Sequence, residues 1–419
     1  MSSSLIRRNI LPIALDAKAV SPVTAISGAR QSGKTTLVHQ LLKDSASRFV
    51  NLDDNSVRAA AQADPDGFAD QYPEGTLAID EIQRVPELLL SIKAALERNR
   101  KPGRFVITGS ANLMQLPRNA ESLAGRMQTI NVNPLSQGEM LGVNEDFGRF
   151  AWELSESRQL PADSPVKRSE YFELATATRF PEIVDWAPRQ QRRWLQNYID
   201  LVISKDVSET FRLQHTDRIE PLLQLFAAQP ASELVAANTA RALNIPERSV
   251  PGYVSALKNV FLLRELPAWG NNITDRSIKK PKVSLVDPGI AAMLNGVSAT
   301  GLELDISSAL AGGTLEAFVV TELAKQQSWS EVDYQLRHWR DSRGNEVDVI
   351  LQNPQREIVG LDVKATSSIN NSHFKGLTTL RDKAGSCFKN GIVLYTGTKA
   401  LPFGERLWAL PISTLWQQS

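Results

Sequence analysis

The stretch Gly28-Ala29-Arg30-Gln31-Ser32-Gly33-Lys34-Thr35 fits the phosphate-binding loop pattern G-x-x-x-x-G-K-[ST] at every required position. Residues 23–27 (VTAIS) predict a buried strand that enters the loop, and residues 36–42 (TLVHQLL) predict a helix that leaves it. This strand–loop–helix setting separates a nucleotide site from a chance turn that contains glycine. The sequence therefore predicts that the chain binds a nucleoside triphosphate.

The residue types in the loop suit phosphate binding. Gly28 and Gly33 permit a tight turn that brings backbone N–H groups against phosphate oxygens, and the helix N-terminus adds its positive dipole end. We expect Lys34 to interact with the β- and γ-phosphates and Thr35 to bind Mg²⁺. Arg30 could contact a phosphate or a partner chain. The expected nucleotide-binding residues are Gly28, Ala29, Arg30, Gln31, Ser32, Gly33, Lys34, Thr35, Thr36 and Ser110.

An acidic pair follows a second apolar strand, at residues 77–79 (LAI). We expect Asp80 to hold Mg²⁺ through its water shell, and Glu81 to orient and deprotonate the attacking water. A strand that ends in two acids is a weak signal alone, because many strands do so. Its position downstream of a phosphate loop favours the catalytic interpretation.

Two further segments could reach the γ-phosphate. The strand at residues 104–110 ends in hydroxyl groups, so Ser110 or Thr108 could lie beside the acidic strand, although a simple turn would have the same sequence. Arg126 follows a glycine. It is either a catalytic arginine that acts on its own or a neighbouring subunit's nucleotide, or an ordinary surface arginine.

Bulk composition limits the remaining possibilities. A chain of 419 residues exceeds a single hydrophobic core, so two or three domains are expected. A net charge of +1 gives no overall signal for a polyanionic partner. The one cysteine, Cys387, excludes an internal disulfide. No signal peptide and no apolar run of roughly 20 residues is evident, so we expect a cytoplasmic protein without a membrane span.

Alternating short strands and helices predict a parallel α/β sheet with helices on both faces for residues 1–137. Residues 138–210 are expected to form a linker and a helical segment. Three helical stretches and a following strand pair predict a winged-helix domain at residues 211–296.

Local charge around the third helix and the hairpin suits contact with nucleic-acid phosphates. Between residues 240 and 289 four acids oppose eight basic residues, which are Arg241, Arg248, Lys258, Arg264, Arg276, Lys279, Lys280 and Lys282. The alternative is a winged helix that serves only as an ATPase lid or a protein-docking module. Pro251, inside the expected third helix, argues against simple insertion into the major groove.

Residues 297–419 are expected to form an α/β domain of restriction-endonuclease-like type. An amphipathic helix at residues 315–323 precedes a hairpin, and Asp348 and Asp362 fall on neighbouring strands. Because residues i and i+2 of a strand share one face, Asp362 and Lys364 should point together. This spacing resembles D-(x)n-(D/E)-x-K, in which two carboxylates bind Mg²⁺ and the lysine acts on the attacking water. Glu316 could complete the metal site.

Several motifs occur in an order that resembles a known family, the prokaryotic AAA-type ATPases with a C-terminal domain of unknown function, DUF4143. They are the phosphate loop, residues 77–83 (LAIDEIQ), 106–110 (VITGS), 123–126 (LAGR), 283–289 (VSLVDPG) and 345–348 (NEVD), and Asp362-Val363-Lys364. The resemblance spans nearly the whole chain and implies ATP binding at residues 28–35. Members commonly have Glu-x-Lys where this chain has Asp362-Val363-Lys364.

Two functions remain open. In the first, the protein is an ATPase that acts on nucleic acid, with DNA as a partner, and Lys364 contributes to a Mg²⁺-dependent nuclease site. In the second, it is an ATP-driven switch or adaptor whose nuclease-like domain only docks DNA or a protein. A homo-oligomer is compatible with both.

Overall fold

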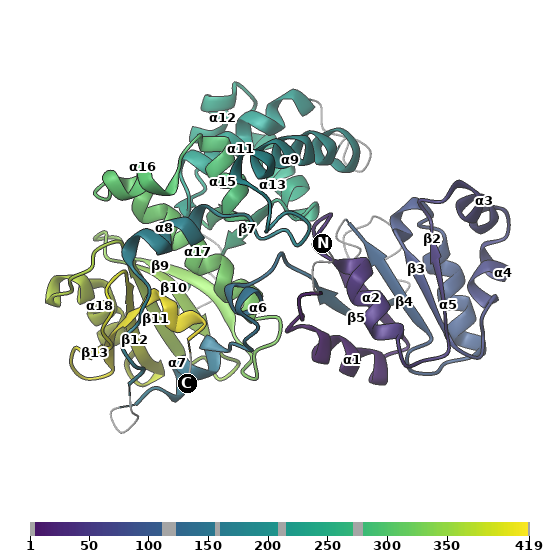
Figure 1. The fold of residues 1–419 in the computed structure, drawn as a ribbon, viewed down its shortest axis with the longest axis horizontal. Helices are drawn as coiled ribbons and strands as arrows, with labels where there is room; N and C mark the ends of the chain where they lie inside the picture. Colours follow the sequence, from purple (N-terminus) through teal and green to yellow (C-terminus); the bar gives the residue numbers. More distant parts are fainter. Residues whose placement is uncertain (1–4, 111–122, 156–159, 208–214, 271–279, 418–419) are drawn as a thin grey trace.

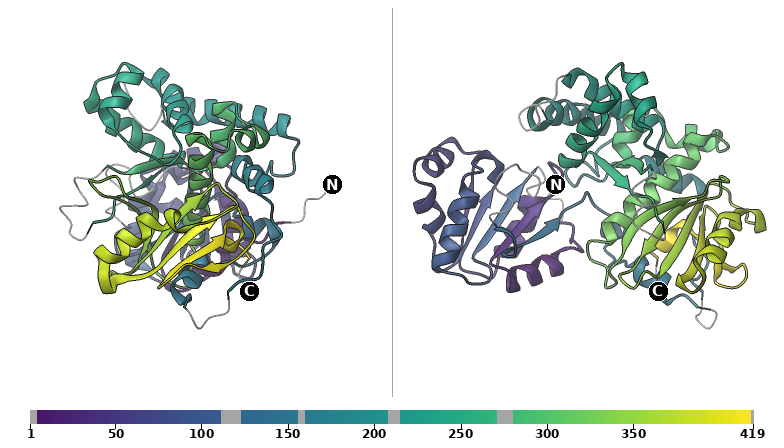
Figure 2. Two further views of the ribbon diagram at one scale, coloured as in Figure 1. Left: turned by 90° about the vertical axis from the view of Figure 1, so that its left-hand side faces the viewer. Right: turned by 180° about the vertical axis from the view of Figure 1, so that it is seen from behind.

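The structure is a computed structural model and describes residues 5–110, 123–155, 160–207, 215–270 and 280–417. Figure 1 shows a sheet unit formed by the N-terminal part of the chain, a helical middle part, and a second sheet unit that contains the C-terminus. Views from the side and from behind show the same three parts (Figure 2). No helix within the described ranges is both long and apolar enough to cross a membrane.

The N-terminal sheet has five parallel strands in the order β2-β3-β4-β1-β5. Their bounds are β1 Val23–Ser27, β2 Ser47–Asn51, β3 Thr76–Asp80, β4 Phe105–Gly109 and β5 Met127–Asn131. In a parallel sheet all carboxyl ends share one edge, where ligands bind. The predicted parallel α/β sheet is thus confirmed.

Helices cover both faces of this sheet, because its buried strands carry apolar residues on each side. Ile26 packs in one hydrophobic cluster with residues of α1 and α2, whereas its neighbour Ala25 packs in another with residues of α5. The helices are α1 Leu11–Val20, α2 Lys34–Leu42, α3 Asn55–Ala63, α4 Pro65–Asp70 and α5 Leu88–Arg98.

Residues 138–210, expected to form a linker and a helical segment, contain several helices, and two different cores share them. The helices are α6 Gln137–Leu141, α7 Phe147–Glu153, α8 Arg168–Thr176 and α9 Pro188–Leu201. Phe147 and Tyr171 belong to the same buried cluster as Val349 and Leu361 of the C-terminal sheet. Helix α9 instead packs with the middle helices through Leu195. The boundaries expected after residues 137, 210 and 296 stay predictions.

The middle part follows the order helix, strand, helix, helix, strand, strand. Its elements are α11 Ile219–Ala228, β6 Ser232–Glu233, α12 Ala236–Leu243, α13 Val250–Asn259, β7 Leu263–Leu266 and β8 Lys282–Leu285, and the sheet order is β6-β8-β7. Pro251 lies in the first turn of α13, where a missing N–H costs nothing. It therefore does not break the helix. The hairpin tip, including Arg276 and Lys279, lies outside the described residues.

The C-terminal part has a mixed six-stranded sheet in the order β13-β14-β12-β11-β10-β9. Helix α17 packs against one face and α18 against the other. The strands are β9 Gln335–Arg340, β10 Glu346–Gln352, β11 Ile358–Lys364, β12 Phe388–Tyr395, β13 Leu401–Pro402 and β14 Leu407–Pro411, and the helices are α16 Ala299–Leu304, α17 Ala309–Gln326 and α18 Lys375–Ala384. Helix α15 Pro288–Asn295 packs with the middle helices through Ile290.

The edge strand β9 is partly covered by the middle part. The Trp269 amide donates to the His338 carbonyl at 2.6 Å, and the His338 amide donates to the Pro267 carbonyl at 3.0 Å. An uncovered strand edge is a template for unwanted pairing. These contacts protect the edge and fix the hairpin of the middle part on the C-terminal sheet.

Candidate nucleotide site and carboxylate cluster

The phosphate-binding loop lies at the carboxyl end of β1 and leads into α2. Gly33 has φ 94° and is the N-cap of α2, a left-handed conformation that glycine adopts without steric cost. A Cβ on Gly28 would lie 2.2 Å from the Val132 carbonyl oxygen, so only glycine fits there. The two glycines of the motif therefore have separate structural roles.

Lys34 is buried, and its ammonium group is bonded within the loop. Its Nζ donates to the carbonyl oxygens of Gly28 at 3.1 Å and Ala29 at 2.9 Å. Burial lowers the pKa of Lys34, while the charges of Glu81 and Asp80 oppose that shift. Carbonyl oxygens thus occupy the ammonium donors that would bind phosphate.

Asp80 ends β3 next to the loop, as the sequence predicts. Its Oδ2 accepts a hydrogen bond from the Thr35 hydroxyl at 3.0 Å, and its Oδ1 accepts one from the Thr108 hydroxyl. A hydroxyl and a carboxylate in contact are oxygen ligands of the kind that Mg²⁺ prefers. Thr35 and Asp80 therefore fit a magnesium ion that would neutralise phosphate charge.

Glu81 has a left-handed backbone with φ 57°, an unusual conformation that tends to cluster at functional sites. Its amide donates to the Thr108 hydroxyl at 3.1 Å. Its carboxylate accepts hydrogen bonds from Gln83 and, at 3.3 Å, from the Ser110 hydroxyl. Thr108 therefore positions both acids, and Ser110 lies beside Glu81.

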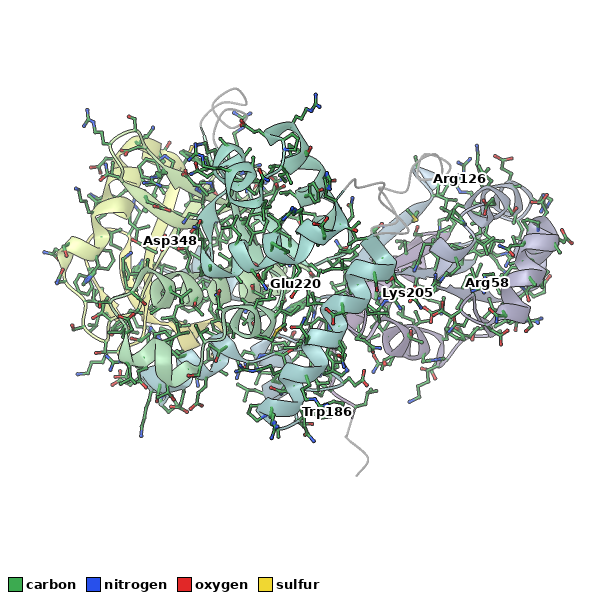
Figure 3. All side chains as sticks on the ribbon, turned by 90° about the horizontal axis from the view of Figure 1, so that it is seen from above. Arg58, Arg126, Trp186, Lys205, Glu220 and Asp348 are labelled. Carbon is green, nitrogen blue, oxygen red and sulfur yellow. The ribbon has the colours of Figure 1, made fainter. Side chains whose placement is uncertain are left out.

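Arg30 binds a residue outside the sheet. Its guanidinium makes two hydrogen bonds to Asp206, from Nε to Oδ2 at 3.1 Å and from NH2 to Oδ1 at 2.8 Å. Hydrogen bonding to Asp206 raises the pKa of Arg30, and the negative charge of Glu81 raises it further. Figure 3 shows Lys205, the neighbour of Asp206, where the middle part meets the N-terminal unit.

Arg8 holds the loop from the other side. Its guanidinium donates to the Ser32 carbonyl at 2.8 Å, to the Asn133 carbonyl at 2.7 Å and to Glu139 Oε1 at 2.9 Å. Arg8 and Glu139 are both buried. The loop is thus fastened to the segment that leads out of the sheet.

Arg126 does not lie at the nucleotide site of its own chain. It directly precedes β5, whose first residue pairs with Val23 at the start of β1, whereas the loop follows the end of β1. Five strand residues separate the two edges by about 16 Å. Arg126 forms an ion pair with Glu97 at 3.9 Å, and Figure 3 shows Arg126 at the border of the unit. An action on its own nucleotide is excluded by this position.

The C-terminal carboxylates come together as expected. Asp348 on β10 and Asp362 on β11 interact through a hydrogen bond, and Lys364 Nζ lies 2.6 Å from Asp362 Oδ1. The Val363 amide donates to Asp348 Oδ2 at 2.8 Å. Burial and the charge of Asp348 raise the pKa of Asp362, and the charge of Lys364 opposes that shift.

An unexpected lysine lies in the same cluster. Lys282 of β8 places its Nζ 2.6 Å from Glu316 Oε1, 2.5 Å from Glu346 Oε1 and 3.6 Å from Asp348 Oδ1. Burial alone would lower the pKa of Lys282, but the charges of Glu316, Asp348 and Glu346 raise it. Figure 3 shows Asp348 where the C-terminal sheet meets the middle part.

This cluster does not fit a magnesium ion. Mg²⁺ requires six oxygens at about 2.0–2.1 Å in octahedral geometry, and the ammonium of Lys282 already lies among the oxygens of Glu316, Glu346 and Asp348. Among the described residues, no three His, Cys, Asp or Glu side chains are arranged to hold a metal.

Several site residues have no recognisable sequence signal. Asp206, Arg8 and Lys282 lie far along the chain from their partners, with 176 residues between Arg30 and Asp206. Glu346 falls in a strand that the sequence predicts, but the sequence gives this residue no function. Gln83 is two residues after Glu81, so among these additional residues it is the one whose place at the site the sequence could have indicated.

The parallel sheet, its phosphate-binding loop and the adjoining acids define a P-loop ATPase of the AAA class. Residues 20–141 match the family model of an AAA domain. Residues 168–301 match a domain of unknown function, DUF8612, and residues 311–415 match the domain of unknown function DUF4143. The chain thus combines an AAA ATPase domain with a C-terminal DUF4143 domain, as the motif order predicts.

The chain is similar to two curated proteins and to several solved structures. An uncharacterized protein of Mycobacterium tuberculosis, Rv2008c, and one of Mycobacterium bovis, Mb2031c, are each 26% identical over 393 residues, which is 93% of this chain and 80% of theirs. The Walker-type ATPase PABY2304 of Pyrococcus abyssi aligns with a TM-score of 0.44 and 13% identity over 69% of this chain and 96% of that one. AMPPCP-bound DnaA of Aquifex aeolicus aligns with a TM-score of 0.28 and 12% identity over 60% and 86%.

Proposed function

We propose that this ATPase is an ATP-driven switch, in which the nucleotide controls how the middle part is held on the AAA domain. The observation that carries the proposal is the pair of hydrogen bonds between Arg30, inside the phosphate-binding loop, and Asp206, in the π-helical turn Val202–Val207 that continues α9. Both side chains are largely buried, with 16% and 12% of their surface exposed. A contact of this kind depends on what the loop binds.

The phosphates of ATP would compete with Asp206 for Arg30. Both are anions that pair with a guanidinium through two parallel hydrogen bonds, and the phosphate chain carries more charge. Opposite charges at hydrogen-bonding distance interact strongly at a partly buried site. Nucleotide binding is therefore expected to weaken the Arg30–Asp206 contact and to free the end of α9.

Lys34 and Glu81 would act in hydrolysis. Lys34 would exchange the carbonyl oxygens of Gly28 and Ala29 for phosphate oxygens, and Glu81 would accept the proton of the attacking water. Thr35 and Asp80 would hold Mg²⁺, which neutralises the charge that develops on the phosphates. Thr108 and Ser110 would keep both acids in position.

The test of the switch is a distance measurement in the full chain. Cys387 is exposed and is the single cysteine, so a spin label there pairs with one at an exposed residue of α3, introduced by Gln62→Cys. We expect a non-hydrolysable ATP analogue to change the distance distribution. Asp206→Asn should produce the changed distribution without nucleotide, whereas Asp53→Asn, which removes the partly exposed contact with Arg84, should not. Identical distributions with and without nucleotide would refute the switch.

A second candidate, action on nucleic acid, is favoured by the exposed basic residues Arg241, Arg248 and Lys280 of the middle part. Three other basic residues that the sequence suggested for DNA contact bind groups of the chain itself. Lys258 binds Glu265, Arg264 binds Asn133 and Lys282 binds the carboxylate cluster. The expected positive surface is therefore smaller than the sequence suggests. DNA binding that strengthens as salt falls would support this candidate. Plasmid nicking that depends on Asp348 and Lys364 would establish a nuclease.

A further inference from the structure

The carboxylate cluster of the C-terminal part already has a cationic occupant. Glu316 comes from α17, Glu346 and Asp348 come from β10, and the ammonium that they surround belongs to Lys282 of β8. Only 5% of the Lys282 side chain is exposed. Three acids from the C-terminal part thus converge on one lysine from the middle part.

The position of Lys282 is fixed by its strand. Lys282 pairs with Leu266 in β7 and with Glu233 in β6, so its backbone belongs to the three-stranded sheet. The same sheet is attached to β9 through the backbone contacts of Pro267 and Trp269 with His338. The backbone of Lys282 is therefore fixed in a sheet, and this places its side chain next to the carboxylates.

A metal ion and this ammonium exclude one another. An ion bound between Asp348 and Glu316 would lie a few ångströms from the Lys282 ammonium, which is 2.6 Å from Glu316 Oε1 and 3.6 Å from Asp348 Oδ1. Two cations at such a distance repel strongly where little water screens them. A buried carboxylate without a partner is costly, so the cluster needs one cation. Lys282 supplies it.

We propose that the carboxylate cluster of the C-terminal domain is a binding site for the Lys282 ammonium, which takes the place of a divalent metal ion and joins the C-terminal part to the middle part. The cluster is then a docking site between two parts of one chain. It binds a divalent ion only after the lysine is removed. This inference is independent of the proposed switch, because it concerns neither ATP nor the phosphate-binding loop.

The experiment is a titration of the nucleotide-free full chain with Mn²⁺, in which electron paramagnetic resonance measures the concentration of free ion. We expect that the wild type binds no Mn²⁺ through Asp348. The Mn²⁺ titration curves of the wild type and of Asp348→Asn should therefore be the same. Lys282→Gln should gain one bound ion, and Lys282→Gln combined with Asp348→Asn should lose it. Lys280→Gln is the matched control, since its side chain is exposed two residues away, and it should behave as the wild type.

Two results would overturn the proposal. One is Asp348-dependent Mn²⁺ binding by the wild type, and the other is a folded Lys282→Gln variant that binds no additional ion. If Lys282→Gln does not fold, the double variant with Glu346→Gln removes one of the unpaired acids but keeps Asp348 and Glu316, and its Mn²⁺ titration decides instead. Thermal unfolding gives a second readout: Mn²⁺ should raise the unfolding temperature of the Lys282 variant and leave that of the wild type unchanged.

Discussion

Lys34 is the residue on which ATP turnover depends most directly. Lys34→Ala removes the buried ammonium that would bind the β- and γ-phosphates, so we expect phosphate release from ATP to be lost while the fold is retained. Lys43→Ala, at an exposed position just after α2, is the control and should keep full turnover. Steady-state phosphate release and circular dichroism of both variants are the measurements; unchanged turnover in Lys34→Ala would show that the site is elsewhere.

Glu81 should separate nucleotide binding from hydrolysis. Glu81→Gln keeps the size of the side chain but removes the proton acceptor, and general-base groups contribute about 10²- to 10⁴-fold to rate. We therefore expect ATP affinity to stay near the wild-type value in calorimetry while turnover falls by a factor in that range. A variant that hydrolyses ATP normally would assign the base to another group.

Glu145 should make stability depend on pH. Burial raises the pKa of Glu145 to about 7, even though Ser136 donates a hydrogen bond to its carboxylate. The folded state thus favours the protonated acid, so stability is greatest below the ordinary pKa of glutamate and decreases as the pH rises toward 7.

Glu145→Gln should remove that loss. We expect the stability of the variant relative to the wild type to increase by about 3 kcal/mol between pH 4.5 and pH 8. Denaturant unfolding across this range is the measurement, and Glu74→Gln, at an exposed position, is the control. Parallel pH profiles for wild type and Glu145→Gln would contradict the prediction.

At the scale of elements, the sequence predicts local structure well and the environment of each element poorly. The strand predicted at residues 23–27 is β1, and the strands expected to carry Asp348 and Asp362 are β10 and β11. These depend on local periodicity and turn signals. The packing of α7 and α8 on the distant C-terminal sheet depends on tertiary contacts that no local pattern encodes.

The segment Val286-Asp287-Pro288-Gly289 shows how one motif starts a helix. Asp287 Oδ1 accepts from the Ile290 amide at 3.1 Å as the N-cap of α15, and its Oδ2 accepts from the Arg179 amide at 2.8 Å. Pro288 occupies the first turn, and a Cβ on Gly289 would lie 2.6 Å from Thr178. The motif therefore joins α15 to the segment that follows α8.

Removing this cap should cost more than removing an exposed one. Asp287→Ala leaves two buried amides without an acceptor, and we expect a loss of about 2–4 kcal/mol of unfolding free energy. Ser298→Ala, which removes the cap of α16 at an exposed position, should cost about 1 kcal/mol or less. Equal losses in denaturant unfolding would show that the contact with Arg179 adds nothing.

At the scale of the whole molecule, Arg126 can act in catalysis only on a neighbouring subunit's nucleotide, because its own lies at the opposite edge of the sheet. If it does, ATP turnover per subunit should rise with protein concentration as oligomers form, and Arg126→Ala should abolish that rise. Turnover measured across a hundredfold concentration range tests this. A constant specific rate would leave Arg126 as a surface residue.

Long-range contacts decide most of what the sequence could not predict. The hydrogen bond between Arg8 and Glu139 joins residues 131 positions apart. The one between Lys282 and Glu316 joins β8 of the middle part to α17 of the C-terminal part. Each uses common residue types at unremarkable positions. The chemistry of the nucleotide site, in contrast, is concentrated in short motifs, which explains why its residues could be named in advance.

The shared core has a practical consequence for truncated versions of the chain. Helix α7 and its neighbour Leu154, together with helix α8, supply one side of the hydrophobic core of the C-terminal sheet, and Trp329 packs in the cluster that holds α1 and α2. A fragment that begins near residue 311 would expose Val349 and Leu361 to water, and a fragment that ends near residue 141 would expose the surface beneath Trp329. Expressed separately, both pieces should aggregate, and co-expressing them should rescue neither, because α7 and α8 belong to neither piece.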